Sequence, residues 1–339
     1  MAANKNASCA NFRRAFFSTV LFPGDKIGVA PAKECGAHAP HGSYPVSVMK
    51  NHHTTTLLCA ASLLATAALT FGGTPITANK ETKPVADEDT VVHPVTSPYF
   101  AEDSFITSDI RPVFVYHNLP GNFLGGGQAS VTAVQVRLKL TDSLQFVAYK
   151  DGWLDVSTRG FGGRGWNDIA AGIKWAFYRN DAAQFHAAVG LGYEFASGDR
   201  SVLQRDDELR AWLSVNKGFG KLHLGATLNY SWSMGNGGSL LGDSDWLSWH
   251  VHADYQVNKW FSPLVEVNGY HTTRGSGVPF SVADVANISN SGSPTVSAAV
   301  GFEVRPLKKV ALRAAFEFPL THDRDVYGNR MTFSSVIKF

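Results

Sequence analysis

The sequence predicts an all-β fold, a transmembrane antiparallel β-barrel of about twelve strands, on three observations. From about residue 105 to the terminal Phe339, short segments alternate apolar and polar side chains with period two, as half-buried strands do. Tight turns alternate with longer polar loops, matching the short periplasmic turns and long extracellular loops of outer-membrane barrels. Aromatic side chains gather near the expected strand ends, where such barrels carry interfacial girdles. A soluble β-sandwich would also alternate, but it has no reason to sort its loops by length.

The predicted hairpins follow one another along the chain. In the segment 166–178, for example, Ile169 and Ile173 share one face while Lys174 lies on the other. Tight turns are expected at residues 141–143, 179–181, 217–220, 258–259 and 306–309. Long loops are expected at residues 118–128, 151–165, 197–207, 234–244, 272–294 and 321–329. A first strand at 110–117 and a last strand at 330–339 complete the barrel.

The composition excludes a class of partner. The 339 residues carry 30 Lys and Arg against 28 Asp and Glu, a net charge of +2, and 17% of residues are charged, whereas soluble domains have about 25%. Nucleic-acid recognition needs clustered Lys and Arg, and the sequence has no such cluster. We therefore expect no nucleic-acid partner.

The N-terminal region predicts an exported protein. Residues 49–78 begin with Met49-Lys50 and continue into the apolar run 57–70, which is the pattern of a cleaved secretory signal peptide. Residues 1–48 precede this signal, so we expect them to be a mis-called extension, with translation starting at Met49.

Two further segments complete the predicted organisation. Residues 79–104 are rich in Lys, Glu, Asp, Pro and Thr and lack periodicity, which predicts a flexible periplasmic lead-in. Residues 105–339 are the predicted barrel. An alternative export signal, the twin-arginine pair Arg13-Arg14, has an apolar run that ends at Pro23. That route exports folded proteins, which does not suit a lipid-facing barrel.

The last strand carries a second targeting feature. It places Phe333, Ile337 and Phe339 on one face, and no residue follows Phe339. This resembles the carboxy-terminal assembly signal of bacterial outer-membrane proteins, which the barrel-assembly machinery reads.

Alternation also assigns the side chains that line the lumen. Those expected to point inward are Arg137, Lys139, Lys174, Glu194, Arg210, His223, His250, His252, Asp254, Glu266, Glu303, Arg305, Arg313 and Glu317. Their signs nearly balance, so we expect no strong preference for cations or anions. The predicted register sets Glu303 opposite Arg313 and His252 opposite Glu266, and such cross-strand pairs stabilise a sheet by about 0.2–1 kcal/mol each. The charges serve either to satisfy one another in a narrow barrel or to contact a solute.

Two patterns resemble reactive sites. His250, His252 and Asp254 lie two apart on one strand and project to one side, so they are a candidate for binding a divalent ion. No further ligand is fixed, and we expect no metal and no cofactor. Residues 160–165 match G-x-G-x-x-G, but a strand rather than a helix follows, so we expect a flexible extracellular loop there.

Enzyme activity is not expected. The Ser, His and Asn constellation of outer-membrane phospholipases and the His and Ser pattern of lipid A deacylases are both missing from the sequence. A nucleophile needs a base within hydrogen-bond reach. The histidines that alternation turns inward could not reach a lipid ester from inside the barrel.

The stretch 165–232 carries a family resemblance. It contains GWNDIAAGIKWAFY, a tight turn and then AAVGLGYEFASGDRS. It resembles the outer-membrane barrel family associated with the meta-cleavage pathway of phenol degradation. Asn167-Asp168 stands for that family's Gly-Asp, Trp175 for its Tyr, and residues 196–199 for its Pro-Thr-Gly-Asp. The resemblance, which continues through 300–306, implies a barrel that passes small organic or aromatic compounds, and the departures leave the substrate class open.

These patterns together predict a porin-like channel or transporter of the Gram-negative outer membrane, for passive passage of small aromatic or hydrophobic solutes. The expected partners are outer-membrane lipids, the barrel-assembly machinery and a small-molecule solute. The alternative is a closed, non-conducting barrel with a structural or adhesion role, which binds partners through its extracellular loops. The sequence leaves open the solute, the state of the lumen, the number of copies, the exact strand number, the start codon and the cleavage site.

Overall fold

The structure is a computed structural model that describes residues 91–235, 244–276, 294–322, 324 and 328–339. The expected extension, 1–48, and signal peptide, 49–78, lie outside the described residues. The described strands are β1 (Asp109–Leu119), β2 (Gly127–Lys139), β3 (Leu144–Lys150), β4 (Trp153–Thr158), β5 (Gly162–Trp166), β6 (Ile169–Asn180), β7 (Phe185–Phe195), β8 (Glu208–Phe219), β9 (Leu222–Ser233), β10 (Asp245–Tyr255), β11 (Phe261–Arg274), β12 (Thr295–Leu307), β13 (Val310–Pro319) and β14 (Asn329–Lys338). A short 3₁₀ helix, η1 (Arg200–Val202), lies between β7 and β8.

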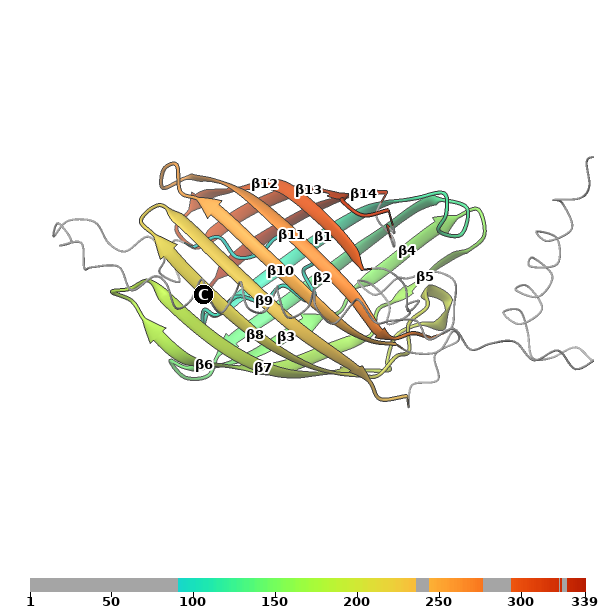
Figure 1. Ribbon diagram of the computed structural model, residues 1–339, viewed down its shortest axis with the longest axis horizontal. Helices are drawn as coiled ribbons and strands as arrows, with labels where there is room; N and C mark the ends of the chain where they lie inside the picture. The colour runs from blue at the N-terminus through green and yellow to red at the C-terminus, as the bar shows by residue number, and fades with distance from the viewer. Residues whose placement is uncertain (1–90, 236–243, 277–293, 323, 325–327) are drawn as a thin grey trace, which may run out of the picture. The chain divides into compact units, whose positions relative to one another are not determined.

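The strands close into a barrel of twelve antiparallel strands (Figure 1). β1 pairs with β2 on one side and with β14 on the other, which closes the sheet. β3 and β4 both pair with β2, over Val136–Lys139 and Gly127–Thr132, so they are two parts of one interrupted strand. β5 and β6 continue one another in the same way, because they pair with β4 and β3. The predicted all-β barrel of about twelve strands is confirmed.

The two ends of the barrel differ, and we call them the turn end and the loop end. The turn end carries short connections at 140–143, 181–184, 220–221, 256–260 and 308–309, close to the predicted tight turns. At the loop end, one prediction is wrong. Residues 151–165 form most of the β4–β5 hairpin rather than a loop, because Leu154 and Val156 pack into an apolar cluster there. The G-x-G-x-x-G match at 160–165 therefore runs into a paired strand.

The wall is apolar outside and polar inside. Along β9, Leu222, Leu224 and Leu228 are exposed, whereas His223 and Thr227 are buried. Soluble proteins bury apolar side chains and expose polar ones, and here that distribution is reversed. It is the pattern of a barrel with lipid outside and a polar lumen inside. In the described part of the chain, no helix is long and apolar enough to cross a membrane.

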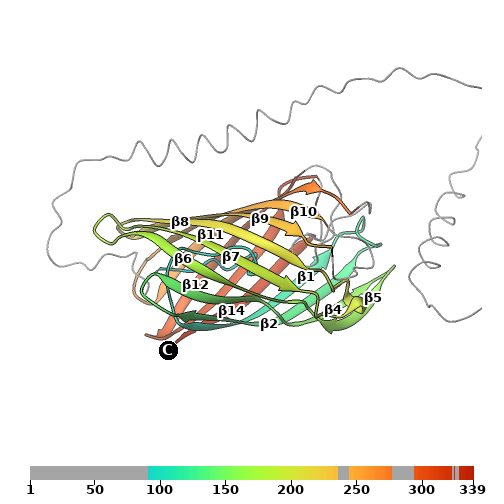
Figure 2. The ribbon, with the colours of Figure 1, turned by 90° about the horizontal axis from the view of Figure 1, so that it is seen from below.

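A segment before β1, residues 91–108, lies inside the barrel, and we call it the inner segment. All its residues are buried except Pro94, Pro98 and Ser108, which are half-buried. Figures 1 and 2 show it as the blue-green trace within the ring of strands. The inner segment therefore fills the lumen.

The inner segment enters and leaves at the turn end. Val91 lies beside Lys308 and Lys309 of the β12–β13 turn. The Ser108 carbonyl accepts a hydrogen bond from the backbone N–H of Phe339, at the end of the last strand. Between these points the chain turns back within residues 97–101. The inner segment is thus a hairpin-like loop with its tip toward the loop end.

This finding differs from the predicted flexible lead-in, 79–104, because its described part, 91–104, is buried. Val92 and Val95 pack against Leu264 and Ala315 of the wall. Composition averaged over the whole stretch hides these apolar residues, and an irregular segment has no period for the sequence analysis to detect.

Candidate functional site

The candidate site is the lumen, where the two acids of the inner segment meet bases of the wall. Glu102 pairs with Arg137, and its Oε2 lies 3.6 Å from Lys174 Nζ. Asp103 lies 3.5 Å from Lys174 Nζ and 3.8 Å from Arg111 Nη2. All five side chains are buried, so these charges compensate one another without bulk water.

Wall side chains also bind the backbone of the inner segment. Glu266 accepts hydrogen bonds from the N–H groups of Val95 and Thr96 at 2.8 and 2.7 Å. Carbonyls of the inner segment accept hydrogen bonds from Gln135 (at Pro98), Gln145 (at Thr107), Ser214 and Thr227 (at Glu102), Arg210 (at Tyr99) and Arg313 (at His93). Within the described residues, the inner segment forms no β-ladder with the wall. Apart from the backbone hydrogen bond between Phe339 and Ser108, wall side chains make these contacts.

The tip of the inner segment is aromatic. The Phe100 ring packs edge-to-face on Trp246, with centroids 4.5 Å apart and planes at 76°. The Arg210 guanidinium lies 5.4 Å from the Phe100 centroid. The Tyr99 hydroxyl donates to the Asp151 carbonyl at 2.9 Å, where β3 breaks before β4. The tip thus occupies a place suited to an aromatic ring and a phenolic hydroxyl.

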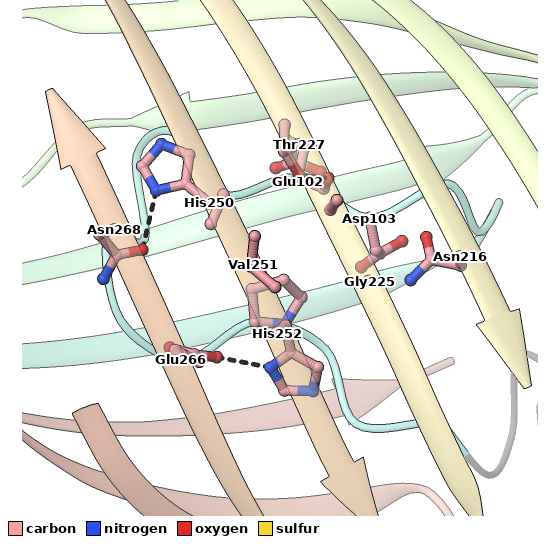
Figure 3. Close-up of a pocket in the computed structure, with 13 residues that line it drawn as sticks. Glu102, Asp103, Asn216, Gly225, Thr227, His250, Val251, His252, Glu266 and Asn268 are labelled. Atoms are coloured by element: carbon pink, nitrogen blue, oxygen red, sulfur yellow. Dashed lines mark hydrogen bonds and ion pairs between the residues drawn. The ribbon is translucent and has the colours of Figure 1, made fainter. Parts of the chain in front are cut away.

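A histidine cluster lies beside the inner segment on β9, β10 and β11. His223 Nδ1 lies 2.6 Å from Asp254 Oδ2, and His252 Nε2 lies 3.1 Å from the same oxygen. His252 Nδ1 lies 2.7 Å from Glu266 Oε1 (Figure 3). Glu266 therefore links this cluster to the backbone of the inner segment.

The predicted trio His250, His252 and Asp254 is not the group that the structure brings together. His250 instead bonds to Asn268 at 2.8 Å, and His223 of β9 takes its place in the cluster. His250 and Asp254 are four residues apart on one strand, about 13 Å, whereas directly opposite residues on neighbouring strands are only about 4.5–5.5 Å apart. His223 is directly opposite Asp254.

Most side chains predicted to line the lumen are buried in the interior. These are Arg137, Lys174, Glu194, Arg210, His223, His250, His252, Asp254, Glu266, Glu303, Arg313 and Glu317. The Arg305 side chain is 14% exposed and bonds to Glu303. Lys139 is 36% exposed and pairs with Asp142 at 2.8 Å at the turn end. The hydrogen bond from Lys139 lowers the pKa of the Asp142 carboxyl, which lies in the turn.

The two predicted cross-strand pairs have different outcomes. His252 and Glu266 are opposite in register and bonded. Glu303 and Arg313 are also opposite, but Arg313 donates to the Ser334 hydroxyl at 3.0 Å and to inner-segment carbonyls. The sequence analysis did not place the inner segment in the lumen, so it could not assign this partner.

Several lumen residues were missed. Glu102 and Asp103 lie in the predicted lead-in, 79–104, so the sequence analysis does not place them in the lumen. Arg111 and Arg330 face inward on β1 and β14, and Arg330 donates to Glu317 at 2.7 Å. Alternation within these two predicted strands was a signal that could have found both.

The predicted assembly residues lie on the outer face of the last strand. Phe333, Ile337 and Phe339 are 48%, 41% and 60% exposed. Inside, a cavity of about 10 Å³ lies beside Glu102, His252 and Glu266, close to the space that one water molecule needs.

Among the comparisons with known proteins, matches come from solved structures alone. No protein-family model matches the sequence, and no curated protein matches it. The NanC porin matches with 13% identity and a TM-score of 0.44, covering 68% of this chain and 100% of that one. The KdgM porin in complex with disordered oligogalacturonate matches with 10% identity and a TM-score of 0.43, covering 68% and 99%. LpxR from Salmonella typhimurium matches with 8% identity and a TM-score of 0.40, covering 68% and 100%. These are likenesses of the barrel alone.

Proposed function

We propose that this chain is an outer-membrane barrel that passes small solutes passively through its lumen, and that the inner segment must withdraw for passage. The observation that carries this proposal is the polar contact between the wall and the inner segment. Because the wall holds the inner segment through Arg137, Lys174, Glu266 and similar side chains, withdrawal exposes groups that water can solvate.

The energetic argument compares this lumen with an apolar core. A protein hydrogen bond contributes only about 0.5–1.5 kcal/mol net, because water replaces the lost partner. Emptying an apolar core would instead expose hydrocarbon, at roughly 25 cal/mol per Å². The apolar side chains that the inner segment buries include Val92, Val95, the aromatic tip and Phe105, whose ring lies beside His186 and His223, so only part of the contact is apolar. In a lumen built this way, water and solute can take the place of the inner segment.

The proposed solutes are small aromatic or hydrophobic compounds. Withdrawal of Phe100 would open the position beside the Trp246 ring and the Arg210 guanidinium to another aromatic ring. The resemblance to the family associated with phenol degradation supports the same class of solute.

The proposal includes the path to the membrane. The signal peptide, 49–78, directs export after synthesis from Met49, and the assembly machinery inserts the barrel by its outward Phe339. The apolar outer face then contacts outer-membrane lipids. The turn end lies in the periplasm and the loop end outside the cell.

Planar-bilayer conductance tests this function. We expect the full-length chain to be silent or to open rarely, and a chain lacking residues 91–107 to give stable discrete steps. The double variant Glu102→Gln, Asp103→Asn keeps the segment but removes its charges, and we expect it to open often. Aromatic solutes should then block the current. Silence in both altered chains, with a folded barrel in each, would refute the channel.

The second candidate function is a closed structural or adhesion barrel. The filled lumen, with a cavity of about 10 Å³, favours it. In that case the inner segment is a permanent core, and its removal should destabilise the barrel instead of opening it.

A further inference from the structure

Three buried side chains bring metal-binding atoms to one place in the lumen. His223, His252 and Asp254 each offer one ligand atom, and these three atoms lie within 4.8 Å of one another. All three side chains are buried. Two imidazoles and a carboxylate are donors that suit a divalent transition metal such as zinc.

The surroundings orient one of these ligands. Glu266 holds His252 Nδ1 at 2.7 Å (Figure 3). The other ring nitrogen, Nε2, then lies 3.1 Å from Asp254 Oδ2. In metal-binding histidines, the ring nitrogen that does not bind the metal commonly donates a hydrogen bond to a carboxylate, which fixes the orientation of the ring.

The distances are close to those of a tetrahedral site. Zinc bonds of about 2.0–2.1 Å place neighbouring donors roughly 3.3 Å apart. His252 Nε2 is already 3.1 Å from Asp254 Oδ2, whereas His223 Nδ1 is 2.6 Å from it. His223 would have to move away from Asp254 by about 0.7 Å, a small side-chain adjustment.

The inner segment keeps His223 from acting as a ligand. Asn216 Oδ1 accepts hydrogen bonds from the Ser104 N–H at 2.7 Å and from its hydroxyl at 2.6 Å. The amide nitrogen of Asn216 is thereby turned to His223 Nε2, at 3.0 Å. Because that nitrogen donates, Nε2 must accept, so the proton sits on Nδ1 and points at Asp254. Figure 3 shows Asn216 beside the inner segment near Asp103.

We propose that His223, His252 and Asp254 bind a divalent transition-metal ion when the inner segment withdraws, and that the metal stabilises the open barrel. Without Ser104, the Asn216 amide can rotate so that its oxygen accepts a hydrogen bond from His223 Nε2–H. His223 then carries its ring proton on Nε2 instead of Nδ1, and Nδ1 can bind the metal. This proposal rests on the proposed withdrawal of the inner segment, because the two states compete through Asn216.

Calorimetric titration of zinc chloride into the untagged mature chain, residues 79–339, in detergent tests the site. Ser104→Pro removes both the N–H and the hydroxyl that hold Asn216, whereas the control Ser104→Ala keeps the N–H. We expect Ser104→Pro to bind zinc about 10- to 100-fold more tightly than Ser104→Ala. A chain lacking residues 91–107 should bind at least as tightly. Adding His223→Ala or His252→Ala to Ser104→Pro should abolish this binding, and adding His250→Gln should not.

Two results would overturn the site. One is equal zinc affinity in Ser104→Pro and Ser104→Ala. The other is zinc binding that survives His223→Ala. The readout is separate from conductance, so the two proposals can fail separately. A silent barrel that binds zinc as expected refutes the channel alone, and a conducting barrel that binds none refutes the site alone.

Discussion

Neighbouring strands of the wall are joined by backbone ladders, as β9 and β10 are from Leu222 to Ser231, whereas the inner segment has no ladder to the wall in the described residues. A ladder uses N–H and C=O groups that every residue but proline carries, so it depends little on which side chain is present. The inner segment depends on named partners such as Arg137 and Glu266. Substitutions in the lumen should therefore separate the stability of the wall from the docking of the inner segment.

The largest expected effect is on docking. Glu102→Gln leaves Arg137 buried without its carboxylate and leaves Lys174 with Asp103 alone, and breaking one buried ion pair costs about 3–5 kcal/mol. We expect chymotrypsin to cut after Tyr99 and Phe100 much faster, while the barrel keeps its folded mobility on gels. Mass spectrometry of the fragments measures the cut. The control Asp142→Asn, in an exposed turn, should leave it unchanged, and an unaltered rate in Glu102→Gln would contradict the comparison.

A slightly smaller loss of stability is expected for a substitution that affects the wall alone. Ile173 is 41% exposed on the outer face near the middle of β6. Ile173→Arg would place a charge in the lipid, at a cost of about 2–4 kcal/mol at the bilayer midplane. Urea unfolding in lipid vesicles should show the loss, and Ile173→Leu serves as the control. Faster chymotrypsin cleavage of the inner segment in the folded Arg variant would show that wall and segment are not separable.

The smallest expected effect concerns a single hydroxyl group that docks the inner segment to the wall. The Thr96 hydroxyl donates to Glu266 and accepts from Asn268 Nδ2 at 2.9 Å. Thr96→Val should weaken docking by about 1–3 kcal/mol, since a buried donor or acceptor is left unsatisfied. Chymotrypsin cleavage should rise less than in Glu102→Gln. The same change at the outward Thr132 should have no effect on it, and equal cleavage in both variants would count against side-chain docking.

Alternation predicted the wall well because each strand repeats one simple rule. In β9, Leu222 and Leu224 face out and His223 faces in, and the sequence alone assigns this. The same rule failed at 151–165, where short paired segments with many glycines carry too little alternation to be recognised.

The inner segment and the histidine cluster depend on long-range geometry. The partners of residues 91–108 lie on many strands, and they face one point only after the barrel has closed. His223 joins Asp254 because β9 and β10 are in a particular register, which spacing along one strand cannot show. The sequence therefore predicted the inward faces but not which inward groups meet.

The return of the inner segment to the turn end also bears on the order of folding. A peptide that crossed the lumen from end to end would have to be threaded before the last seam closed. A loop whose two ends, Val91 and Ser108, lie at the same rim needs no threading. The β1–β14 seam can form first and the loop can be inserted afterwards, so this geometry allows the sealing of the lumen to be a separate step from the assembly of the wall.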